Sequence, residues 1–136
     1  MTRYIGVLEG ADDNWGVWIP DVMGCVSAGS TADEAINNII MALSDIAELT
    51  IADGDKLPDA RSAADVMRDE WVADALAKGD VLVRIPLIVE EGRTTRANIS
   101  LDAGLLRAID DSAKERGLTR SAFIASTMRE RIASDA

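Results

Sequence analysis

Residues 93–133 can supply one short strand and two helices, which is too little to enclose a core within a single chain. From residue 96 to residue 101, apolar and polar side chains alternate, as in a strand with one buried face. The apolar face holds Ala97, Ile99 and Leu101, and the polar face holds Arg96, Asn98 and Ser100. Because a lone strand leaves its backbone groups unpaired, we expect this segment to pair with the same segment of a second chain.

Two capped helices follow this strand. Asp102 is a good N-cap, and apolar residues recur at helical spacing until Gly117, which favours the left-handed conformation that commonly ends a helix. Thr119 is suited to cap a second helix, and Leu118 and Phe123 have the spacing of a hydrophobic staple. The apolar sides of both helices have no partner within the segment, which again favours a dimer.

This pattern resembles the ribbon-helix-helix family of bacterial repressors across essentially all of residues 93–133. In that family, two antiparallel strands form a ribbon that enters the major groove, and the second helix begins at a backbone phosphate. By position, the resemblance implies that Arg96, Asn98 and Ser100 read base edges and that Thr119, Arg120 and Ser121 bind phosphate. Arginine suits guanine, asparagine suits adenine, and exposed amides at a helix start attract anions. A solvated dimerisation module that never contacts DNA stays open as an alternative.

Charge is distributed unevenly along the chain, whose formal net charge is -10. Residues 1–80 hold 16 acidic and 5 basic side chains, a net charge of -11, whereas residues 81–136 hold 8 acidic and 9 basic side chains, a net charge of +1. The N-terminal part is therefore expected to repel DNA and attract a basic partner, and the C-terminal part to bind phosphate at most modestly.

The N-terminal part reads as a small α+β domain. Strands are expected at residues 3–9, 15–19, 25–28 and 81–89, with a polar turn at residues 11–14. Between the third and fourth strands, Thr31 and Glu34 form a capping box for a long amphipathic helix that ends near Ala52. Pro86 cannot donate to a ladder, so the last strand is expected at a sheet edge or with a bulge. A further helix is expected within residues 61–77, and the stretch of residues 53–80 around it is either a docked helix or a flexible connector.

The segment PDVMGCVSAGSTADEAINNI, residues 20–39, resembles the N-terminal domain of HicB-type antitoxins. There, a Pro-Asp turn, a Gly-Cys pair, a small-residue turn and a helix with an acidic start recur in this order. The resemblance covers residues 3–52 and extends to about Val89. It implies a β-β-β-α-β domain at residues 1–90, similar to a partial ribonuclease H fold without its nuclease activity, followed by a ribbon-helix-helix domain at residues 91–136.

What this resemblance implies is an antitoxin of a type II toxin-antitoxin system. The first domain would neutralise a small, basic, mRNA-cleaving toxin of the HicA type, and the second would repress the operon that encodes both proteins. An acidic partner can compete with RNA for such a toxin. The expected toxin contacts lie around the first hairpin: Asp12, Asp13, Trp15 and Asp21. Trp18 is expected to be buried, although both tryptophans packing against the long helix is an alternative.

Other functions follow less well from the residues. A stand-alone ribbon-helix-helix repressor, with an N-terminal domain that senses a ligand or oligomerises, stays open. An enzyme does not fit, because the carboxylates do not converge and the chain has no histidine. We expect no catalytic residue, metal or cofactor.

The sequence also indicates compartment and assembly. Neither a signal peptide nor an uncharged apolar run of about 18 residues is seen, so a cytoplasmic protein without membrane contact is expected. The single cysteine, Cys25, is expected to be a small buried residue. Since Arg96 is the only arginine of the strand, two dimers should bind DNA side by side, as a tetramer joined through the N-terminal domains.

Overall fold

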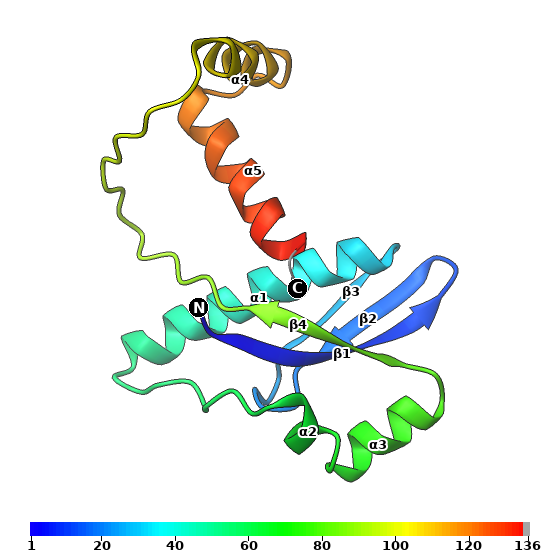
Figure 1. The fold of residues 1–136 in the computed structure, drawn as a ribbon. Helices are drawn as coiled ribbons and strands as arrows, with labels where there is room; N and C mark the ends of the chain where they lie inside the picture. The colour runs from blue at the N-terminus through cyan, green and yellow to red at the C-terminus, as the bar shows by residue number, and fades with distance from the viewer. Residues whose placement is uncertain (135–136) are drawn as a thin grey trace. The chain divides into compact units, whose positions relative to one another are not determined.

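The computed structural model describes residues 1–134 and divides the chain into two compact units, Met1–Glu91 and the residues from Gly92 onward. The first unit contains a four-stranded antiparallel sheet with helices on both faces, and the second contains a pair of helices (Figure 1). The expected α+β fold is confirmed.

The sheet has the strand order β3-β2-β1-β4, and each neighbouring pair is antiparallel. Its strands are β1 (Arg3–Ala11), β2 (Asn14–Trp18), β3 (Val26–Gly29) and β4 (Val81–Pro86). Ala11 pairs with Asn14, so β1 and β2 form a hairpin whose turn is Asp12 and Asp13. Asp12 has a φ of 55°, a left-handed conformation that aspartate tolerates better than most residues. The strand β4 is an edge strand, as Pro86 predicts, and it ends three residues earlier than expected.

One face of the sheet is covered by α1 (Ala32–Ala52) (Figure 1). Thr31 begins this helix as predicted, because its Oγ1 accepts a hydrogen bond from the Glu34 backbone N–H at 3.0 Å. The reciprocal half of the capping box is replaced by another bond, in which the Glu34 carboxylate accepts from the Ser30 hydroxyl at 2.7 Å. By length and composition alone, α1 could cross a membrane. In the folded unit, however, Ile39 and Leu43 of its apolar stripe are fully buried in the core.

The other face carries α2 (Ala63–Val66) and α3 (Glu70–Ala77), so the single helix expected within residues 61–77 is wrong. The helix is interrupted between α2 and α3 because Asp69, the N-cap residue of α3, adopts an extended backbone conformation. Val66 and Val72 are fully buried and join a core cluster with Ile5 and Val7 of β1. This segment is therefore docked on the sheet and is not a flexible connector.

The second unit consists of α4 (Ala103–Glu115) and α5 (Arg120–Ser134). Both predicted caps are confirmed, since Asp102 Oδ2 accepts from two backbone N–H groups at 2.8 and 3.2 Å and Thr119 Oγ1 accepts from Ala122 N at 3.2 Å. Gly117, with a φ of 66°, separates the helices. Residues 96–101 are exposed and form no strand in the single chain, where no second chain is present to pair with them. Their pairing into a ribbon stays a prediction.

Candidate functional site

The tip of the β1-β2 hairpin presents two carboxylates to solvent. Asp12 and Asp13 occupy the two turn positions and are both exposed. The indole Nε1 of Trp15 donates a hydrogen bond to the backbone oxygen of Asp12 at 3.0 Å, and the Trp15 side chain is partly exposed. The structure thus brings three of the four expected toxin contacts together, with the polar atom of the indole already used to hold the turn.

Asp21, the fourth expected contact, lies elsewhere and is bound within the protein. Its side chain is only 6% exposed and accepts hydrogen bonds from the backbone N–H of Arg61 at 2.9 Å and from Arg61 Nε at 2.6 Å. The same guanidinium binds both carboxylate oxygens of Asp69 at 3.0 and 2.7 Å. These hydrogen bonds, first to Asp69 and then to Asp21, raise the pKa of Arg61. Because Asp21 is buried, it is a poor candidate for a toxin contact. Through Arg61, its carboxylate instead holds the α2-α3 segment in place.

The two hairpin tryptophans lie on opposite faces of β2, as alternation predicts. Trp18 packs against the cluster that contains Val72 of α3, so the alternative in which both indoles pack on α1 is wrong. It is partly exposed, whereas full burial was expected. Cys25, by contrast, is 1% exposed, and burial raises the pKa of its thiol to about 11. The expectation of a small buried residue is confirmed.

A third tryptophan, which the sequence reasoning missed, is the most exposed aromatic side chain of the described residues. Trp71 lies in the first turn of α3 and is 79% exposed. Beside it is an open hollow of about 370 Å³, lined by Trp18, Pro20, Asp69, Glu70, Trp71 and Val72. The sequence held one signal of this exposure, because Trp71 directly follows three charged residues. In the structure, the next residue, Val72, lies on the buried side of the helix.

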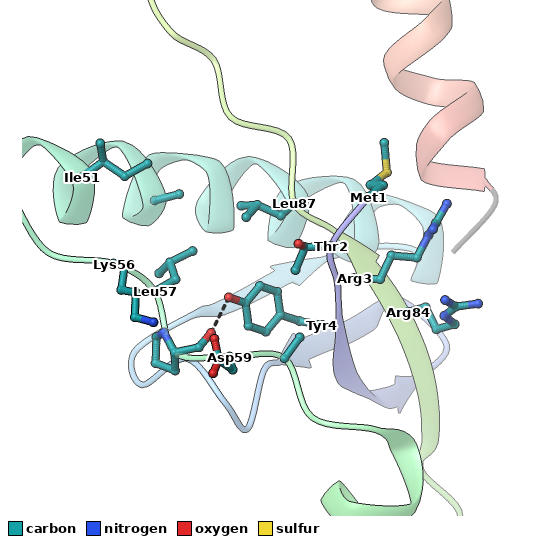
Figure 2. Close-up of a pocket in the computed structure, with 13 residues that line it drawn as sticks. Met1, Thr2, Arg3, Tyr4, Ile51, Lys56, Leu57, Asp59, Arg84 and Leu87 are labelled. Carbon is teal, nitrogen blue, oxygen red and sulfur yellow. Dashed lines mark hydrogen bonds between the residues drawn. The ribbon is translucent and has the colours of Figure 1, made fainter.

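A cavity of about 660 Å³ lies between the start of β1 and the loop that follows α1 (Figure 2). The Tyr4 hydroxyl donates to the Pro58 backbone oxygen at 2.6 Å across this region, and burial, with smaller effects of the Asp21 and Asp59 charges, raises the pKa of Tyr4. Three cationic side chains line the cavity: Arg3, Lys56 and Arg84. Within residues 1–134, no three or more Cys, Asp or Glu side chains are grouped to hold a metal ion.

In the second unit, the expected base readers Arg96, Asn98 and Ser100 are all exposed. Of the expected phosphate contacts, Thr119 caps α5, Ser121 is exposed, and Arg120 is held in an ion pair. Arg120 donates from Nε and Nη2 to the two carboxylate oxygens of Asp110, each at 2.8 Å. These hydrogen bonds lower the pKa of Asp110. A phosphate would therefore compete with Asp110 for this guanidinium.

Large apolar side chains of the second unit lie open to solvent in the single chain. They are Ile99, Leu101, Leu105, Leu118 and Met128, and Ile99 is the most exposed of them at 66%. The residues of this unit that are buried are two alanines, Ala113 and Ala133, within the described part of the chain. Among its described residues, this unit therefore lacks the buried core of large apolar side chains that gives a helix pair its stability.

Comparisons with known proteins agree with this architecture. An uncharacterized 14.9 kDa protein in the rep-hol intergenic region of Haemophilus phage HP1 (strain HP1c1) is 31% identical over 103 residues, which are 76% of this chain and 75% of that protein. The crystal structure of the antitoxin HicB of Burkholderia pseudomallei is 25% identical and covers 100% of both chains, with a TM-score of 0.52. The antitoxin HicB3 is 24% identical over 96% of this chain and 98% of its own, with a TM-score of 0.54.

A complex of the toxin HicA3 with the antitoxin HicB3 also contains this fold, at 19% identity over 64% of this chain and 99% of that chain, with a TM-score of 0.52. Residues 4–128 match the family described as HicB-like antitoxin of bacterial toxin-antitoxin systems. The resemblance to HicB-type antitoxins is thereby confirmed. Since the match spans nearly the whole sequence, this chain belongs to the HicB-like antitoxin family, which is not a family of enzymes.

Proposed function

We propose that this antitoxin neutralises a HicA-type mRNA-cleaving toxin by direct binding through its first unit. The observation that supports this best is the charge of that unit, in which residues 1–91 hold 18 acidic and 6 basic side chains, a net charge of -12. A toxin that binds RNA needs a basic surface, and a strongly acidic protein is steered toward it and competes with the phosphates. The exposed carboxylates of Asp12 and Asp13, beside Trp15, are proposed contacts.

The second unit, in this proposal, represses the operon of the toxin and antitoxin as a ribbon-helix-helix dimer. Its exposed apolar residues would be buried when residues 96–101 of two chains pair. Arg96, Asn98 and Ser100 would then point into the major groove, and the start of α5, with Thr119, Arg120 and Ser121, would meet the backbone. Two such dimers, joined through the N-terminal units as a tetramer in the cytoplasm, would supply the affinity that one short ribbon lacks.

Co-expression with a HicA-type toxin, sought as a short basic reading frame beside this gene, tests the toxin part of the proposal. Growth should stop when the toxin is expressed alone and recover when the full-length antitoxin is added, and the two proteins should co-elute as a stable complex. Absence of rescue and of a complex would refute direct neutralisation. DNA from the promoter of this operon, titrated with the antitoxin, tests repression separately, since it should bind more tightly than DNA of scrambled sequence.

The cavity of Figure 2 favours a second candidate, a repressor whose first unit senses a small molecule. Its volume of about 660 Å³ is within the range of small-molecule sites, and it combines apolar with cationic lining residues. A small anionic metabolite that raises the melting temperature of the antitoxin and changes operator affinity would support this candidate. Rescue from a toxin would not be expected of it.

A further inference from the structure

The position of Trp71 cannot be explained by the core of the unit to which it belongs. Its neighbours Val72 and Ala75 are buried and fix α3 on the sheet, while Trp71 itself is 79% exposed. A tryptophan buries on the order of 200 Å² when it is covered, so leaving one in water forgoes a large favourable contribution. Single exposed apolar residues are common, but contiguous apolar patches with a polar rim mark interaction sites, and Trp71 adjoins Trp18 and Pro20.

The surface around Trp71 is also built to receive a side chain. The open hollow of about 370 Å³ beside it combines an apolar part, formed by Trp18 and Pro20, with the carboxylate-bearing Asp69 and Glu70. Two residues of its lining are held by the rest of the protein, because Val72 is fully buried in the core and both carboxylate oxygens of Asp69 are bound by Arg61. A surface held in place before binding loses less conformational freedom when a partner arrives.

Charge identifies the chemistry of the partner. From residue 65 to residue 80, this surface segment carries five acidic and two basic side chains, and it belongs to a unit with a net charge of -12. Nucleic acid would be repelled, and a second acidic unit that used this same surface would meet like charges, so the contacts of the proposed tetramer are expected elsewhere on the unit. A basic protein is attracted, and its arginine or lysine side chains can stack on the exposed indole and pair with the neighbouring Glu70, since Asp69 is already bound by Arg61.

We propose that the basic toxin docks on α3, with Trp71 as the apolar anchor of the interface and the neighbouring carboxylates as its rim. This inference rests on the proposed antitoxin function and assigns the binding site within it. Trp15 is a weaker anchor, because it is less exposed and its N–H is bonded to Asp12. The hairpin acids Asp12 and Asp13 accelerate encounter, whereas Trp71 sets the lifetime of the complex.

The test compares three variants of the full-length antitoxin in binding to the purified HicA-type toxin that the co-expression experiment identifies as its partner. Trp71→Ala should raise the dissociation constant about 30-fold or more, mainly through faster dissociation, as expected for an interface hot spot. Leu49→Ala, a control at a 68% exposed position of α1, should bind within about threefold of wild type. The double variant Asp12→Asn/Asp13→Asn should chiefly slow association, and more so at low salt.

Two further measurements keep the outcomes distinct. Circular dichroism and the melting temperature should be unchanged in Trp71→Ala because the side chain contributes little to the core. Binding should shift tryptophan emission to shorter wavelength in wild type, and the shift should be clearly smaller in Trp71→Phe, which keeps Trp15 and Trp18 but lacks the exposed indole. If Trp71→Ala binds like wild type while wild type binds tightly, the docking site is wrong and the antitoxin function stands. If wild type itself does not bind, both are refuted.

Discussion

Replacing Ile99 with alanine should weaken the proposed dimer of the second unit. Ile99 lies on the apolar face of the alternating segment and is 66% exposed in the single chain. Fully burying an isoleucine contributes about 1.5–3 kcal/mol, so covering two-thirds of it in each of two chains contributes about 2–4 kcal/mol per dimer. Since alanine retains only the first carbon of the side chain, about 2–3 kcal/mol is lost, and the dimer dissociation constant should rise about 30- to 150-fold.

Sedimentation equilibrium of the full chain over a concentration series measures this constant directly. The matched control is Asn98→Ala, one residue away on the opposite face, which should leave the dimer unchanged but weaken operator binding by about 1–3 kcal/mol and relax preference at one base. Because a shift of one residue exchanges the faces of a strand, the two variants report on the register of the ribbon. An unchanged dimer in Ile99→Ala, or a weakened one in Asn98→Ala, would refute the alternating ribbon.

Three further predictions concern other parts of the chain. Asp110→Asn frees Arg120 for phosphate, so DNA affinity should rise for all sequences. In anisotropy titrations, the slope of log affinity against log salt concentration should steepen by about 1 per new contact, and an unchanged slope would contradict phosphate binding by Arg120. Cys25, with its pKa raised to about 11, should resist iodoacetamide at pH 8 until urea is added, as mass spectrometry can show; rapid native labelling would contradict its burial. Asp21→Ala leaves two donors of Arg61 without their acceptor and should lower the free energy of unfolding by about 1–3 kcal/mol in urea titrations. A variant that lost toxin binding without being destabilised would instead indicate that Asp21 contacts the toxin.

Local signals account for the elements that were predicted from the sequence. The start of α1 follows from Thr31, and the starts of α4 and α5 follow from Asp102 and Thr119, whose side chains bond to backbone groups two or three residues away. Such contacts involve neighbours in the chain and can be read without knowing the fold. The edge position of β4 was likewise predictable, because the missing N–H of Pro86 is a property of the residue itself.

The break between α2 and α3 depends on contacts that are distant in sequence. Arg61 joins Asp21, 40 residues earlier, to Asp69, and no periodicity within residues 61–77 indicates this bridge. The exposure of Trp71 has a similar origin, since it depends on which side of α3 faces β1. The strand predicted at residues 96–101 is a different case, because the groups that would pair with it in the proposed ribbon belong to a second chain.

The charges of the two units bear on how toxin binding and repression influence each other. In the proposed function, the unit that approaches phosphates is tethered to residues 1–91, which carry a net charge of -12, and this repulsion would weaken DNA binding, most strongly at low salt. A basic protein bound to the first unit cancels part of that charge without contacting the second. On electrostatic grounds alone, the toxin-bound antitoxin is therefore better suited to DNA than the free antitoxin. Repression would then be strongest when all of the toxin is bound, and the thermodynamic linkage requires that operator DNA strengthen toxin binding by the same factor.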